Sequence, residues 1–111
     1  MIEKTVLDYM SGQLEVPCYM MRPAEVPKKY VLIEKTGSSK DDHITTSTFA
    51  FQSYAPTLPE AAELNEEVKA AAESIVALYS VTKSALQSDY NFTNIANKQP
   101  RYQAVYDITH Y

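Results

Sequence analysis

Residues 44–78 read ITTSTFAFQSYAPTLPEAAELNEEVKAAAESIVAL, and the period of the hydrophobic residues changes within this stretch. In 44–54, which is rich in Thr, Phe and Tyr, Phe49 and Phe51 lie two residues apart, as on one face of a strand. Further on, apolar residues recur every three or four positions, which is the period of an amphipathic helix. They are Ala61, Leu64, Val68, Ala71, Ile75 and Leu78. A long strand followed directly by a long helix predicts an α+β domain.

The start of this helix has its own sequence signal. Thr57-Leu58-Pro59-Glu60 is a capping box, in which the threonine side chain accepts from an N–H of the first turn and the glutamate reaches back. Pro59 falls in the first turn, where its missing N–H costs little. We therefore predict that the helix begins at this point.

Working outward, we expect residues 36–43, which are small and polar, to be a loop that joins strand 44–54 to a preceding strand in a hairpin. The further elements expected are a short helix over 2–10 that Gly12 ends, and strands over 16–21, 30–35, 79–92 (irregular at 84–88) and 101–111. The prediction is one α+β domain, residues 1–111, with a single antiparallel sheet of four to five strands. One long and one short helix pack on one face.

Composition excludes several functional classes. The chain has 111 residues, a formal net charge of -4 and a pI near 5.1, whereas nucleic-acid binding by a domain on its own depends on a basic face. Cys18 is the only cysteine, so no intrachain disulfide can form. Residues 1–10 are charged and lack the apolar core of a signal peptide, and no apolar run is long enough to span a bilayer. We expect a soluble protein made in a reducing cytoplasm, without a membrane role.

A search for catalytic or metal-binding patterns yields little. His43 and His110 are the only histidines, and neither has a second ligand at a recognised spacing. Cys18 has no neighbouring base that would activate it, and two glycines cannot build a phosphate-binding loop. We expect no enzyme, no metal and no cofactor.

Tyrosine is the unusual feature of the composition, with nine residues that fall mostly in expected strands. Tyrosine suits a half-buried pleated surface, and it is also enriched in protein interfaces because its ring is apolar and its hydroxyl can remain wet. A domain of this size cannot bury nine phenols and satisfy each hydroxyl inside. Several tyrosines are therefore expected at subunit contacts.

Three segments together resemble a known family: KYVLIEKTG at 29–37, FQSYAP at 51–56 running into EAAELN at 60–65, and RYQAVYDIT at 101–109. Their order and spacing, and the length of the chain, resemble small tail proteins of long-tailed bacteriophages and prophages of Gram-positive bacteria. Within that group the chain is most similar to a tail terminator, also called a tail completion or head-tail joining protein. The likeness covers almost the whole chain, and FQSYAP is its most characteristic part.

The resemblance implies a structural role in the virion. Tail terminators are small α+β subunits that form a ring, usually a hexamer, on the tail tube. The ring stops polymerisation of the tube protein and presents a surface to the neck of the filled capsid. The implied partners are other copies of the chain, the tail tube protein and a head-completion or neck protein, and genomic DNA passes through the channel without specific binding. The implied location is the head-tail junction of the virion, with assembly in the host cytoplasm.

Two sets of residues are candidates for these contacts. The expected loop, which we predict to meet a neighbouring subunit, the tube protein or the channel, comprises Thr36, Gly37, Ser38, Ser39, Lys40, Asp41, Asp42 and His43. The second set is the acidic helix face with part of the tyrosine population, namely Glu63, Glu66, Glu67, Glu73, Tyr54, Tyr102 and Tyr106. Three alternatives remain open: another connector or neck protein of the same gene block, a monomeric regulatory binding module, and, ranked last, a small enzyme.

Overall fold

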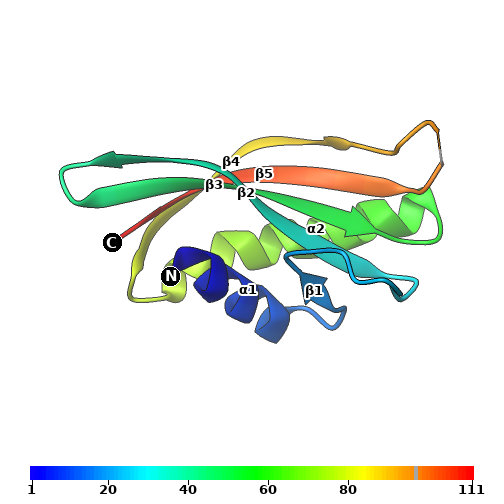
Figure 1. Cartoon of the computed structure of the whole chain (residues 1–111), viewed down its shortest axis with the longest axis horizontal. Helices are drawn as coiled ribbons and strands as arrows, with labels where there is room; N and C mark the ends of the chain where they lie inside the picture. Colours follow the sequence, from blue (N-terminus) through cyan, green and yellow to red (C-terminus); the bar gives the residue numbers. More distant parts are fainter. Residues whose placement is uncertain (97) are drawn as a thin grey trace.

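One five-stranded sheet with helices against one of its faces makes up the computed structural model, which describes residues 1–96 and 98–111 (Figure 1). The strand order is β1-β2-β3-β5-β4. Along the chain the elements are α1 (Ile2–Gln13), β1 (Cys18–Tyr19), β2 (Tyr30–Asp41), β3 (Ile44–Tyr54), α2 (Leu58–Ser74), the 3-10 helix η1 (Ile75–Ala77), β4 (Val81–Asn91) and β5 (Arg101–His110). The predicted α+β class, with one long and one short helix on a single sheet, is confirmed.

The core lies between the sheet and the two helices. Phe49 and Phe51 of β3 are fully buried on the face that α2 covers, where Leu64 and Val68 meet them in one hydrophobic cluster. Val6 and Met10, one helical turn apart on α1, belong to the same cluster. The alternate apolar residues of β3 and the apolar residues spaced three or four apart on α2 therefore face each other across the core, as the sequence predicts.

The predicted cap at the start of α2 is present. The backbone N–H of Glu60 donates to the Thr57 hydroxyl oxygen at 3.3 Å, and that hydroxyl donates to the Glu60 carboxylate at 2.9 Å. The carboxylate thus reaches back to the side chain of Thr57. These bonds, together with nearby Lys29, hold the pKa of Glu60 below its usual value. At the other end the helix tightens into η1, and Ile75 is still buried there.

Two expectations near the N-terminus need correction. Gly12 does not end the first helix, because no glycine has a positive φ and α1 continues to Gln13. The expected strand 16–21 is reduced to Cys18 and Tyr19, which pair in parallel with Val31 and Leu32. Every other strand pair in the described residues is antiparallel. Proline at position 17 removes a backbone donor, so the sheet gains only this short segment here.

The strands β4 and β5 form the predicted second hairpin. Ala104, Tyr106 and Ile108 are buried on the α2 side, which agrees with the alternation seen in the sequence. The pairing shifts between Val81 and Lys83, and again between Leu86 and Ser88. The second shift lies within 84–88, where the sequence predicts an irregularity, and it leaves Gln87 as an extra residue in β4.

Candidate assembly surfaces

The hairpin of β2 and β3 projects beyond the helices at one end of the molecule (Figure 1). β2 continues to Asp41, and only Asp42 and His43 form the turn, with φ values of 52° and 73°. Two successive positive φ values are typical of the tight turns that match the twist of a hairpin. The prediction that 36–43 is a loop is therefore wrong for Thr36–Asp41, which are strand. The threonine-rich partner segment of β3 has high strand propensity, and pairing with it outweighs the small polar composition.

A bulge separates the core part of β2 from its projecting part. Lys35 pairs with Phe49 and Gly37 with Thr48, so Thr36 is left over, and its hydroxyl donates to the Thr48 carbonyl at 3.5 Å. Beyond this point the strand leaves the helices, and the eight residues from Thr36 to His43 are all exposed. Their predicted contact with a partner stays a prediction, although the segment is accessible for it.

The sheet has an open edge on each of its two sides. On one side, β1 pairs with β2 only at Val31 and Leu32, so that 33–41 has no strand neighbour there among the described residues. On the other side, β4 is the last strand in the order, and most of its residues are exposed. Such edges present backbone N–H and C=O groups that can pair with another chain.

Asp89 fastens the β4 edge to the long helix, a role that the sequence does not reveal. Its carboxylate accepts hydrogen bonds from Asn65 and from Lys69, each at 2.6 Å. Asp89, followed by Glu66, raises the pKa of Lys69, so the ammonium stays charged. The only sequence signal is Asn65, a polar residue beside Leu64 on the side of α2 that faces the sheet, where it is 2% exposed.

The four glutamates of the predicted acidic face have different surroundings. Glu66 forms an ion pair with Lys69 at 2.6 Å, and the carboxylate of Glu73 accepts a hydrogen bond from the Tyr106 hydroxyl at 2.6 Å. Glu63 and Glu67 are exposed and line a groove beside α2. The predicted face is thus divided, with two of its carboxylates bound to neighbours within the chain.

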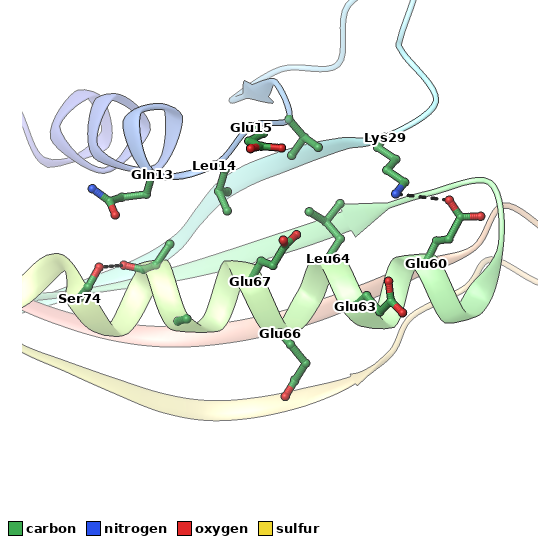
Figure 2. Close-up of a pocket in the computed structure, with 13 residues that line it drawn as sticks. Gln13, Leu14, Glu15, Lys29, Glu60, Glu63, Leu64, Glu66, Glu67 and Ser74 are labelled. Atoms are coloured by element: carbon green, nitrogen blue, oxygen red, sulfur yellow. Dashed lines mark hydrogen bonds and ion pairs between the residues drawn. The ribbon is translucent and has the colours of Figure 1, made fainter.

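That groove lies between α2 and the segment that follows α1, and it has a volume of about 880 Å³ (Figure 2). Leu14, Val16 and Leu64 are the larger apolar residues that line it, and Glu15 and Glu67 line it from opposite sides. At one end, the ammonium of Lys29 lies 3.4 Å from the carboxylate of Glu60. The groove is therefore mainly acidic at its rim.

For two of the three tyrosines predicted at an interface, burial within the chain contradicts the prediction. Tyr106 is 0% exposed beneath α2, and Tyr54 is 5% exposed on the other face of the sheet, so neither ring is available to a partner; Tyr102 is half-buried. The hydroxyls of the two buried tyrosines are satisfied within the chain: that of Tyr106 donates to Glu73, and that of Tyr54 donates to Gln52 and accepts from Arg101. The exposed tyrosines are instead Tyr79, Tyr90 and Tyr111. Strand alternation identifies two faces but does not say which neighbours cover each.

Arg101 organises the face of the sheet that the helices leave uncovered. Its Nη1 donates to the Tyr54 hydroxyl at 2.8 Å, and its guanidinium lies 4.2 Å from the centre of the Phe92 ring. The Tyr54 ring stacks on Tyr30 at 4.5 Å between ring centres. This aromatic cluster covers one end of the sheet without a helix, which explains why Tyr30 and Tyr54 are buried there.

Comparisons with protein-family models and with curated proteins find no match to this sequence. Within residues 1–96 and 98–111, no three or more His, Cys, Asp or Glu side chains are grouped so as to hold a metal ion. Nor does any helix in that part of the chain have the length and apolar character needed to cross a membrane.

Proposed function

We propose that this chain is a phage tail terminator, a structural subunit that forms a ring on the tail tube, stops tube polymerisation and joins the tail to the head. The observation that carries the proposal is the pair of open edges on opposite sides of one sheet. A closed ring requires two different, complementary surfaces on each subunit, because each copy meets one neighbour on either side. The two edges meet that requirement in a subunit of 111 residues.

The projecting hairpin supports the same role. Its exposed polar tip extends past the helices and can reach a second component while the edges engage neighbouring subunits (Figure 1). A net charge of -4 on each subunit also suits a ring through which DNA slides, since a basic lining would hold the phosphates. In this proposal the tube protein and the neck protein bind opposite ends of the ring.

Deleting the gene from the phage or prophage that carries it tests the proposal. Electron microscopy of the lysate should show overlong tails, many of them without heads, because nothing stops the tube. Supplying the intact chain from a plasmid should restore normal tails, and so should the control variant Glu25→Gln, which alters an exposed residue outside both edges. Normal virions in the deletion lysate would contradict the proposal. Headless tails of normal length would point instead to a neck protein of the same gene block.

A further inference from the structure

We propose that β4 of one subunit pairs, antiparallel, with the outer side of β2 in a second copy of this chain, so that the sheet continues from subunit to subunit. The inference rests on the proposed ring, and it identifies the surfaces that build it. The partner is another copy, because both edges belong to the same sheet and are complementary in direction, length and charge.

Strand direction comes first. β2 is antiparallel to β3, β3 to β5, and β5 to β4, so β4 runs opposite to β2. When copies are related by rotation about an axis along the strands, each β4 meets a β2 that runs the other way. The resulting pair is antiparallel, which is the more stable arrangement.

The free lengths of the two edges match. On β2 the segment 33–41 has no partner on its outer side, and β4 offers Val81–Asn91. From Thr36 to Asp41 and from Gln87 to Asn91 every residue is exposed, although the carboxylate of Asp89 is bound to Asn65 and Lys69 of α2. Two large apolar residues of β4 are also accessible, since Leu86 is 44% exposed and Tyr90 is 39% exposed.

The free part of β2, residues 33–41, carries Lys35 and Lys40 on one face of the sheet and Glu34 and Asp41 on the other. β4 carries one charge of each sign on opposite faces. Lys35 pairs with Phe49 and so lies on the helix side, whereas Asp41, opposite Ile44, lies on the other side. On β4, Asp89 contacts α2 and Lys83 is opposite Thr109 on the uncovered side. The two edges therefore present opposite charges on each face.

One antiparallel register places opposite charges across from each other on both faces of the sheet. If Lys83 is opposite Asp41 of the next copy, counting six residues along each strand brings Asp89 opposite Lys35. Within the described residues, neither Asp41 nor Lys83 forms an ion pair in its own chain, whereas Lys35 lies 3.7 Å from Glu3 and Asp89 lies 2.6 Å from Lys69, so the second pair would add to existing ones. Opposite charges across a strand pair stabilise it, and like charges destabilise it.

The bulges of the two edges lie at adjacent positions in this register. Thr36 is the extra residue of β2 and Gln87 that of β4, and the register sets Gly37 opposite Gln87 and Thr36 opposite Ser88. Bulges on an edge normally discourage pairing with other chains. Because the two bulges are at neighbouring positions along the strand pair, they interrupt the new pairing only once and leave regular segments on either side.

Charge reversal gives a test in which mixing two defective variants restores assembly. Asp41→Lys places lysine against Lys83 of the next copy, and Lys83→Asp places aspartate against Asp41. Each variant alone should associate about tenfold more weakly than the intact chain, the effect of replacing an attractive exposed pair by a repulsive one. In an equimolar mixture the two variants alternate, every contact again joins opposite charges, and the oligomer should return.

Sedimentation velocity and native mass spectrometry of the purified full-length chain, from micromolar to millimolar concentration, give the readout. The matched controls Glu25→Lys and Lys28→Asp make equal charge changes at exposed residues away from both edges and should associate like the intact chain. Circular dichroism establishes that each variant is folded.

Three results would overturn the edge pairing: an intact chain that stays monomeric at every concentration, single variants that associate normally, or a mixture that fails to recover. An isologous contact between two β4 strands would leave Asp41→Lys, a change on β2, with normal association, which is the second of these results. Failure of the proposed function is a separate outcome. Normal virions after gene deletion would leave the subunit contact standing, whereas a monomeric chain with overlong tails in the deletion lysate would remove only the contact.

Discussion

The hydroxyl of Tyr106 donates to the carboxylate of Glu73 at 2.6 Å, from a ring that is completely buried between β5 and α2. The ring edge also meets Phe51 at 6.1 Å between ring centres. This residue therefore joins the sheet to the long helix by packing and by one charge-assisted hydrogen bond.

Replacing Tyr106 by Phe should lower the free energy of unfolding by about 0.5–1.5 kcal/mol, because the ring still packs but the hydrogen bond is lost. Urea unfolding followed by circular dichroism measures the change. Tyr79→Phe is the matched control, since Tyr79 is 100% exposed, and its stability should equal that of the intact chain. Equal losses in both variants would contradict this role for Tyr106.

The same residue predicts a loss of stability in alkali. Burial, and then the Glu73 carboxylate, raise the pKa of Tyr106 above its usual value of 10.0, so the folded state keeps the proton. Above pH 10 the unfolded chain ionises at this position and the folded chain does not, which favours unfolding. The contribution is fully present below pH 10 and decreases as the pH rises further. In unfolding measurements between pH 8 and 11, Tyr106→Phe should show a shallower decline than the intact chain, and parallel curves would refute this.

The cap of α2 gives a second stability test. Thr57→Ala removes the acceptor for the Glu60 N–H and should cost about 1 kcal/mol. Thr57→Ser retains the hydroxyl and should lose no more than a few tenths of that amount. Thermal unfolding of the two variants side by side distinguishes loss of the cap from a general effect of substitution at residue 57.

The hydrogen bonds of Asp89 that link β4 to α2 should contribute more to the free energy of unfolding than a surface ion pair does. Asp89→Asn replaces the charged acceptor of Lys69 and Asn65 and should cost about 1–2 kcal/mol, because these hydrogen bonds join a charged group to partly buried partners. Asp8→Asn breaks the exposed Lys4–Asp8 pair and is the comparison, with little or no expected effect. Chemical unfolding at dilute concentration measures both, and equal stabilities would show that Asp89 does not fasten the edge.

The sequence predicts well the bounds of those elements whose hydrophobic pattern is imposed by packing in the core. The strand over 44–54 has the predicted bounds because Phe49 and Phe51 must both face the helices, and α2 begins where Thr57 caps it. Burial imposes the period in both cases, so that the period is readable without knowledge of the partner.

The hairpin and the interface tyrosines depend on contacts that a single segment does not encode. Gly37 and its serine neighbours are typical of a loop, and they become strand only because β3 supplies an extended partner. Tyr106 and Tyr90 are both tyrosines in predicted strands, and one is buried because β5 lies under α2 while the other is exposed on the edge. The order of the strands, which decides between them, is a property of the whole chain.

The two-residue strand β1 contains a cysteine whose chemical modification can be used to follow the opening of that strand. Cys18, the only thiol, is half-buried where β1 pairs with β2, and burial raises its pKa, so it reacts slowly at neutral pH. Detachment of two residues costs little compared with unfolding of the sheet. We therefore expect thiol modification to become faster when this strand opens, and with one thiol in each chain the mass added to an intact complex gives the number of its subunits.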